Sequence, residues 1–179
     1  ILLVSNYYSS YISAGTSKRT RELKKGLSKL GWKCKVLTIK RKSLPLSKEK
    51  DNSDITTIKT LSEKYPIPFI KILKILDLIR SSDVVHIIDH WSALNLTCVI
   101  LCLLSKTPYI YSPCGALKPE GRNIFIKKIY NFLFLNLISS NASFFFAITK
   151  KELKEIKFIT KSNVQIILLP NGIWKESKK

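Results

Sequence analysis

Short apolar segments alternate with segments of helical length along the whole chain, and no other feature of the sequence limits the possible folds as much. The apolar segments are rich in β-branched and aromatic residues, which is typical of strands in a parallel sheet buried on both faces. The sequence therefore predicts an α/β fold: a doubly wound, mostly parallel seven-stranded sheet with helices on both faces. The expected strands are Ile1–Ser5, Lys33–Ile39, Ile55–Lys59, Asp83–Ile88, Tyr109–Ser112, Ser143–Ile148 and Val164–Leu169, and the expected helices are Ser17–Leu30, Ile67–Arg80, Ser92–Ser105, Asn123–Ser139 and Lys150–Phe158.

The length of the chain suits one such domain. It has 179 residues, and single domains commonly run to about 100–200 residues. We expect residues 1–173 to form the domain and residues 174–179 to begin a linker. The apolar stretches Leu94–Leu104 and Ile124–Ile148 do not suit membrane spans, because the first is short and the second carries two lysines, whereas a span needs roughly 20 mostly uncharged residues.

Four cysteines lie at wide and irregular spacing, at positions 34, 98, 102 and 114. This spacing fits neither a disulfide framework nor a zinc ribbon. We therefore expect reduced thiols in a cytoplasmic protein, and no metal site.

Loops that follow the strands are the candidate site, because ligands of open α/β sheets bind beyond the carboxyl ends of the strands. The first loop leads to Gly15 and Thr16 and lacks the G-x-G-x-x-G spacing of dinucleotide-binding loops. A glycine at a helix N-terminus leaves backbone N–H groups and the positive end of the helix dipole open to a phosphate or a sugar hydroxyl. The alternative is a glycine that serves only the turn.

Asp89 and His90 follow the fourth strand. An imidazole titrates near neutral pH and can move a proton or bind a sugar hydroxyl, and a neighbouring carboxylate can orient it or bind hydroxyls itself. His90 is thus the candidate catalytic residue with Asp89 beside it, and a plain surface role explains His90 equally well. His86, inside the strand, is better explained as a buried histidine with satisfied hydrogen bonds.

Cys114 and Gly115 follow the fifth strand in a stiff turn between two prolines, which lets a ligand approach the backbone. No histidine or aspartate partner can be assigned to Cys114, so a thiol that only lines a pocket is favoured over a nucleophile. Asn171 and Gly172 follow the last strand and on their own predict only a turn.

Seven segments, in this order along the chain, resemble the N-terminal half of a group 1 (family 4-type) glycosyltransferase. They are Ile1–Val4, Gly15 before a basic helix, Gly31–Thr38, Asp83–His86, Ser112–Leu117, Thr149–Glu152 and Leu169–Ile173. The sequence departs from the family's pattern at Ala14, Ile88 and Cys114, where the family often has a glycine, a histidine, and a histidine or arginine, respectively.

The resemblance implies one half of a GT-B fold, which consists of two Rossmann-like domains. The N-terminal domain mainly holds the acceptor, and the C-terminal domain, which holds the nucleotide-sugar, lies outside this sequence. The implied activity is a retaining hexosyltransferase that passes a sugar from a nucleotide-sugar to a saccharide or lipid-linked acceptor in cell-surface polysaccharide or lipopolysaccharide biosynthesis. This half alone is expected to be inactive, and the nucleotide-sugar co-substrate is the only small molecule implied besides the acceptor.

The same resemblance implies roles for the loops. Gly15 and Thr16 are expected to face the donor diphosphate and the acceptor, while the His90 loop and Cys114-Gly115 line the acceptor side. Asn171 and Gly172 lie where these enzymes cross into the second domain, and we expect them to contribute to the substrate and donor-phosphate site.

Positive charge dominates the sequence, with a formal charge of +19 and 13 basic against 2 acidic residues among the first 50. Such a surface attracts anionic lipid headgroups, a lipid-linked diphosphate or nucleic acid. We expect peripheral binding to the inner face of a membrane through basic side chains of the first helix and the next loop, namely Lys18, Arg21, Lys25, Arg41 and Lys42. The alternative is a lysine-rich surface that is merely solvated.

A second hypothesis concerns a different class of protein, a non-catalytic basic α/β module that binds nucleic acid or another polyanion. No helix-turn-helix, RNP-like or zinc-finger pattern accompanies the charge, so nucleic acid is the less favoured partner. A second βα domain with paired glutamates in the same reading frame would favour the enzyme.

Overall fold

The structure is a computed structural model that describes residues 1–9, 15–40, 54–60, 71–160 and 163–172. Its strands are β1 (Leu2–Ser5), β2 (Lys35–Ile39), β3 (Ile55–Ile58), β4 (Val85–Ile88), β5 (Tyr109–Ser112), β6 (Phe144–Ala147) and β7 (Gln165–Leu168). Its helices are α1 (Gly15–Lys29), α2 (Ile72–Arg80), α3 (Ala93–Ser105), α4 (Ile124–Asn141) and α5 (Lys150–Thr160). Every strand and helix that the sequence predicts is present with somewhat shifted ends, and positions 67–70 of the second expected helix lie outside the described residues.

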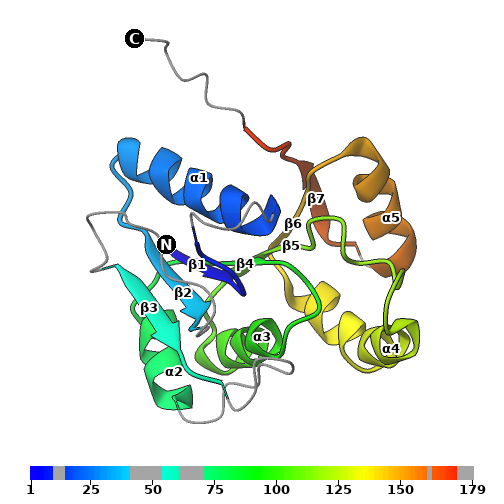
Figure 1. The fold of residues 1–179 in the computed structure, drawn as a ribbon, viewed down its shortest axis with the longest axis horizontal. Coiled ribbons are helices and arrows are strands. Elements are labelled where there is room, and N and C mark those ends of the chain that lie inside the picture. The colour runs from blue at the N-terminus through cyan, green and yellow to red at the C-terminus, as the bar shows by residue number, and fades with distance from the viewer. Residues whose placement is uncertain (10–14, 41–53, 61–70, 161–162, 173–179) are drawn as a thin grey trace.

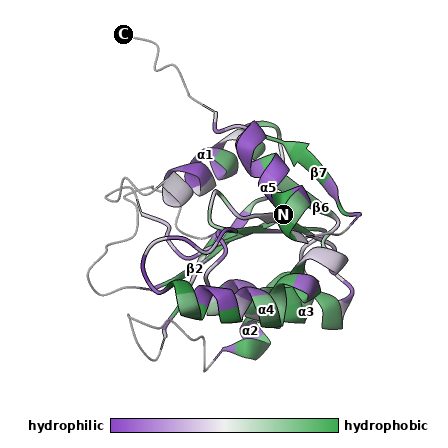
Figure 2. Cartoon of the chain, turned by 90° about the vertical axis from the view of Figure 1, so that its right-hand side faces the viewer, coloured by the Kyte–Doolittle hydropathy of each residue, from purple (hydrophilic) through white to green (hydrophobic). Residues whose placement is uncertain are grey.

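The seven strands form one sheet in the order β3-β2-β1-β4-β5-β6-β7, and all neighbouring strands are parallel. α1 and α5 cover one face of the sheet, while α2, α3 and α4 cover the other (Figures 1 and 2). The predicted doubly wound, Rossmann-like α/β fold is therefore confirmed. From β1 the chain adds strands toward one side of the sheet, and from β4 onward it adds them toward the other side. Ligands of such sheets bind at the carboxyl ends of the strands beside this switch point.

Both faces of the central strands are buried, as the apolar strands predict, while the edge strands β3 and β7 are partly exposed. Leu2 and Val4 pack into the larger core cluster, whereas Leu3 between them belongs to a smaller cluster with Tyr8 and Val36. Successive strand residues point to opposite faces, so one short strand supplies both clusters. Every residue of β1 and of β4 is buried.

α1 packs on the sheet only partly as its leucine spacing predicts. The spacing places Leu23, Leu27 and Leu30 on the inner face, but Leu30 is 76% exposed and the other two are only half-buried. The residues of α1 that are buried are polar or charged: Ser17, Arg19, Thr20 and Lys24. Leu23 and Leu27 nevertheless pack against the smaller core cluster, so the expectation from hydrophobic spacing holds for these two and is wrong for Leu30.

Gly31 ends α1 as a glycine with positive φ. Its φ is +87°, its N–H donates to the Ser28 carbonyl, and the next N–H, of Trp32, donates to the Leu27 carbonyl. These two bonds form a Schellman motif, which favours glycine because the left-handed conformation strains other residues.

The two apolar stretches that do not suit membrane spans form α3 and, for the second, α4 with β6. Within the described part of the chain, no helix combines the length and the hydropathy that a transmembrane span requires. All four cysteines are free of disulfide bonds.

Candidate functional site

Polar side chains join the ends of β1 and β4 at the carboxyl edge of the sheet. Asn6 follows β1, and its amide nitrogen donates to Asp89 Oδ2 at 3.2 Å. The Ser92 hydroxyl donates to Asn6 Oδ1. Asn95 donates to the carbonyls of Ile88 and Asp89 at 3.1 and 2.9 Å. These bonds hold the loop after β4 against the loop after β1, as the parallel sheet predicts.

Asp89 lies in the centre of this network in a conformation that is uncommon for its residue type. Its φ is +84°, in the left-handed region that non-glycine residues occupy at a cost of roughly 1–2 kcal/mol. Its Oδ1 accepts from the backbone N–H of His90 at 2.7 Å. Burial raises its pKa, while the hydrogen bonds from His90 and Asn6 lower it less strongly. Strained backbone and a desolvated carboxyl group are both common at ligand-binding sites.

His90 is fully buried, so the alternative of a plain surface role does not hold. Its Nε2 lies 2.8 Å from Asn131 Oδ1, and its Nδ1 lies 2.8 Å from the Tyr111 hydroxyl. The Asn131 amide nitrogen donates to the Leu117 carbonyl at 3.0 Å, which orients its oxygen toward the imidazole. His90 Nε2 therefore carries the proton, and Nδ1 accepts from Tyr111.

Burial also keeps His90 neutral, because it lowers the pKa of the imidazole to about 4. Three aromatic rings, those of Trp91, Tyr111 and Tyr130, surround the imidazole edge-on. Both ring nitrogens already have protein partners, so this geometry suits an imidazole that holds its surroundings in place better than one that moves a proton.

His86 is the buried histidine that the sequence favours. It is 4% exposed, and its Nε2 lies 2.7 Å from the Ser112 hydroxyl on the neighbouring strand. Burial, with a smaller contribution from the charge of Arg19, lowers its pKa to about 3. A neutral imidazole hydrogen-bonded across two central strands serves the core of the sheet.

The loop after β5 makes a tight turn at Cys114 and Gly115. Their φ angles are +54° and +79°, and the Ala116 N–H donates to the Pro113 carbonyl at 3.1 Å. Two consecutive positive φ angles define a type I′ turn. Burial raises the pKa of the half-buried Cys114 thiol to about 12, so it is protonated at neutral pH and is a poor nucleophile.

The Gly115 N–H, which the sequence predicts to be open to a ligand, is engaged by Glu152. This carboxylate is 3% exposed and accepts from the N–H of Gly115 at 2.6 Å and from that of Ile148 at 2.7 Å. It therefore ties the loop after β5 to the loop after β6. Glu152 belongs to a segment that carries the family resemblance, but no local pattern indicates this role.

Replacing Gly115 by alanine should lower the free energy of unfolding by about 1 kcal/mol, because a β-carbon is strained at φ +79° whatever space surrounds it. Gly15→Ala is the matched control: Gly15 starts a helix, and a β-carbon there meets nothing within 4 Å, so no loss is expected. Urea unfolding measures both. Equal stability of the two variants would contradict the strained turn.

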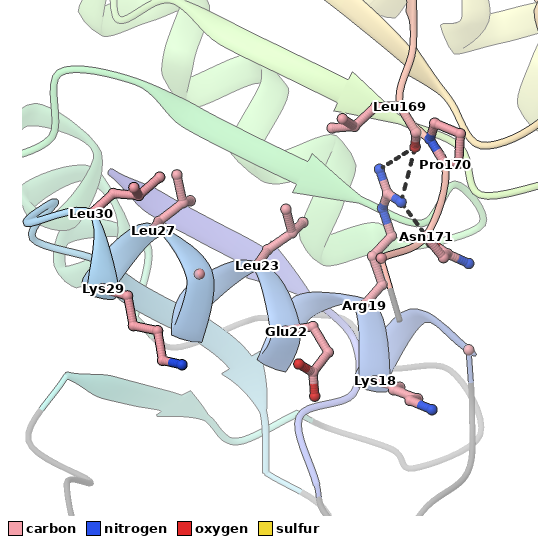
Figure 3. A pocket seen from close by; sticks show the side chains of 13 residues that line it. Lys18, Arg19, Glu22, Leu23, Leu27, Lys29, Leu30, Leu169, Pro170 and Asn171 are labelled. Carbon is pink, nitrogen blue, oxygen red and sulfur yellow. Dashed lines mark hydrogen bonds between the residues drawn. The ribbon is translucent and has the colours of Figure 1, made fainter. Parts of the chain in front are cut away.

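Arg19 connects α1 to the loop after β7, and sequence reasoning missed it. Its guanidinium donates to the Leu169 carbonyl at 3.3 Å from two nitrogens and to Asn171 Oδ1 at 2.6 Å (Figure 3). The side chain is 6% exposed, and its Nε has no hydrogen-bond partner in the part of the chain that the structure describes. Among the described residues, no carboxylate lies within 4.0 Å of its nitrogens. A buried positive charge thus lies at the carboxyl edge with only neutral partners.

A largely apolar groove of about 850 Å³ separates α1 from the loop after β7. Figure 3 shows the leucine row of α1 on one side and Leu169, Pro170 and Asn171 on the other. Gly15 and Gly172 line it as well. The structure thus brings Gly15, Asn171 and Gly172 to one groove, while Asp89, His90, Cys114 and Gly115 belong to the loops that end the central strands. Thr16 is half-buried in the first turn of α1.

The basic residues expected to face a membrane are placed only in part. Lys18 and Lys25 are exposed on α1, whereas Arg21 is half-buried. Lys18 lines the groove beside Arg19. Arg41 and Lys42 lie outside the described residues, as does the linker expected at 174–179. No three His, Cys, Asp or Glu side chains gather as a metal site within the described ranges.

Comparison with known proteins adds information about the fold. No protein-family model matches the sequence, and no curated protein matches it. Solved structures do match, among them a sucrose-phosphate synthase of Thermosynechococcus elongatus that is 14% identical, with a TM-score of 0.58. The alignment covers 96% of this chain and 88% of that one. At this level of identity the likeness concerns the Rossmann-like fold, and the family 4-type resemblance stays a prediction.

Proposed function

We propose that this chain is the acceptor-side, N-terminal domain of a glycosyltransferase that moves a sugar from a nucleotide-sugar to a saccharide or lipid-linked acceptor. The fold it shares with a sucrose-phosphate synthase supports the proposal at a coarse level. The observation that carries it is the buried Arg19 guanidinium beside the N-terminus of α1, held only by neutral oxygens.

A diphosphate suits this end of α1 for physical reasons. The first turn of the helix contains no acidic residue, Gly15 is exposed, and Lys18 lines the same groove. Helix N-termini favour anions, and arginine binds phosphate oxygens with high directionality. We infer that the donor diphosphate approaches Gly15 and Thr16, and that Arg19 stabilises its charge.

We place the acceptor beside the hydrogen-bonded polar residues that follow β4. Asp89 can bind sugar hydroxyls at the carboxyl edge, because it is only half-buried, and the hydrogen bond from Asn6 holds its carboxylate in place. We assign His90 a positioning function, because its ring nitrogens hold Tyr111 and Asn131. No proton transfer by His90 is needed in this proposal.

A transfer assay on the protein in the length that its gene encodes tests the proposal. Labelled UDP- and GDP-sugars are incubated with the protein and a membrane extract, and we expect at least one sugar to enter an acceptor. Lys18→Gln and Arg19→Gln should lower kcat/KM by at least about tenfold, as expected for lost phosphate contacts. Lys35→Gln is the matched control, an exposed lysine at the amino end of β2. Absence of transfer, together with retention of the protein on RNA, would favour the polyanion-binding alternative.

The 179-residue chain alone should bind nucleotide-sugars weakly, because the resembled family takes most nucleotide contacts from the other domain. Isothermal titration with UDP- and GDP-sugars should show dissociation constants in the millimolar range or weaker. A micromolar constant would contradict the assumed division of labour between the two domains.

A further inference from the structure

One side of α4 presents apolar side chains to solvent over almost the full length of the helix. Phe132 is 87% exposed, Phe125 75%, Leu133 56% and Ile126 55%. We call this the α4 surface; its members are Phe125, Ile126, Ile129, Phe132, Leu133 and Leu137. Exposed apolar residues are normal when scattered singly, but a contiguous set along one helix marks an interaction site.

The α4 surface is not the side by which the helix joins the domain. Leu135 and Ile138 are buried in the core on the opposite side, and Tyr130 and Phe134 pack against the same cluster. Figure 2 shows α4 in the lower helical layer, with both hydrophobic and hydrophilic turns. α4 thus carries apolar side chains on its core side and on its solvent side, and the described residues cover only the core side.

Positive charge borders the α4 surface, and negative charge is nearly absent. α4 contains Lys127 and Lys128 and no acidic residue, and Arg122 precedes it. From residue 101 to 150 the sequence has six basic residues and one acidic residue, Glu120. Glu120 is paired with Lys118 at 2.7 Å. Arg122 and Lys128 are exposed beside the apolar side chains.

Charge distinguishes between the partners that an apolar helix face could bind. Two copies of a chain with formal charge +19 repel each other, which disfavours self-association through this face. An anionic lipid surface supplies both an apolar layer and the opposite charge. We propose that the α4 surface binds an anionic bilayer, with the helix lying in the plane of the interface.

In this arrangement the phenylalanine and leucine side chains enter the boundary between headgroups and acyl chains. Arg122 and Lys128 then lie at the level of the phosphate groups. The membrane contact expected on α1 is thereby assigned to α4, because the apolar side chains of α1 line the groove while those of α4 face solvent. Vesicle binding needs neither donor nor acceptor sugar, so this inference stands or falls separately from the proposed function.

Sedimentation with vesicles tests the proposal on the 179-residue chain. We expect binding to phosphatidylcholine vesicles that contain about 30% phosphatidylglycerol, and much weaker binding to phosphatidylcholine alone. The variant Phe125→Ser/Phe132→Ser/Leu133→Ser should bind at least about tenfold more weakly, because it removes most of the apolar area that would enter the lipid. The matched control is Leu30→Ser/Trp32→Ser/Phe158→Ser, which removes side chains of similar exposure from the α1 and α5 side of the sheet.

A second variant, Arg122→Gln/Lys128→Gln, tests the contribution of the basic side chains. It should reduce the preference for anionic over neutral vesicles several-fold. The variant Lys18→Gln/Lys25→Gln on α1 should change the preference for anionic vesicles less. The assignment to α4 would be overturned if the two double variants lost the preference for anionic vesicles equally. It would also be overturned if the two triple variants lost vesicle binding equally. A lipid-free dimer that the α4 variant abolishes would overturn it in favour of self-association.

A labelled residue gives a second readout that does not depend on the triple variant folding. Phe132→Cys carrying an environment-sensitive fluorophore should show a blue shift when anionic vesicles are added, and Leu30→Cys with the same label should not. The side chains of Phe132 and Leu30 are 87% and 76% exposed, so both positions accept a label without disturbing the core. A shift at Leu30 equal to that at Phe132 would contradict the proposal.

Discussion

Lowering the pH from 7.5 to 5.0 should reduce the free energy of unfolding of this domain by about 4 kcal/mol, from the histidines alone. The sequence has two histidines, and both are buried. Burial lowers the pKa of His86 to about 3 and that of His90 to about 4, against 6.5 for an exposed imidazole. The unfolded chain therefore takes up two protons below pH 6.5 that the folded chain does not bind. The stability is fully present above pH 6.5 and is lost as the pH falls toward the folded-state pKa values.

Urea unfolding at pH 7.5, 6.5, 5.5 and 5.0 measures this loss. Each histidine contributes a slope of up to about 1.4 kcal/mol per pH unit. Asp89 acts in the opposite direction, because burial raises its pKa and protonation then favours the folded state. His90→Gln, whose amide can replace both ring hydrogen bonds, should roughly halve the change in the free energy of unfolding per pH unit. A stability that is constant between pH 7.5 and 5.0, or an unchanged slope in His90→Gln, would contradict the buried neutral histidines.

Replacing Glu152 by alanine should cost about 3 kcal/mol of stability, because two backbone N–H groups lose their acceptor in a buried environment. The N–H groups are those of Gly115 and Ile148, at 2.6 and 2.7 Å from the carboxylate. For a domain of this size the melting temperature should fall by about 6–12 °C. The loss should also loosen the turn at Cys114, since Glu152 is what holds Gly115 to the loop after β6.

Glu155→Ala on the same helix is the matched control. Among the described residues, Glu155 makes a single long ion pair, 3.8 Å, with the exposed Lys151, so its removal should change stability by less than about 0.5 kcal/mol. Glu152→Gln should lie between the two alanine variants, because its amide keeps one acceptor and turns a donor toward the other N–H. If thermal unfolding shows Glu152→Ala and Glu155→Ala to be alike, the carboxylate does not hold the two loops together.

The order and type of the elements can be predicted from the sequence because those signals are local. Apolar β-branched runs indicate buried strands, and segments such as Ser17–Leu30 show helical spacing between them. Parallel strands bring their carboxyl ends to one edge, so the sequence alone also places the loops at Asp89 and Gly115 on the same edge.

The partners of the site residues cannot be predicted in this way, because the bonds join positions far apart in the sequence. Glu152 accepts from Gly115 across 37 residues, and Arg19 donates to Asn171 across 152. The position of His90 after a strand suggests a proton-transfer group. Its buried contacts with Tyr111 and Asn131, supplied by β5 and α4, decide that it is neutral.

Helix orientation is the second property that the local pattern leaves open. Hydrophobic spacing shows which side chains of a helix share a face, but the packed neighbours determine whether that face is covered. In α1, Leu23 and Leu27 pack against the smaller core cluster, while Leu30 in the same row is 76% exposed. In α4, residues such as Phe132 stay exposed although the segment has the composition of a core helix. The free energy of burying an apolar group depends on the surface removed from water, and that area exists only once the elements are assembled.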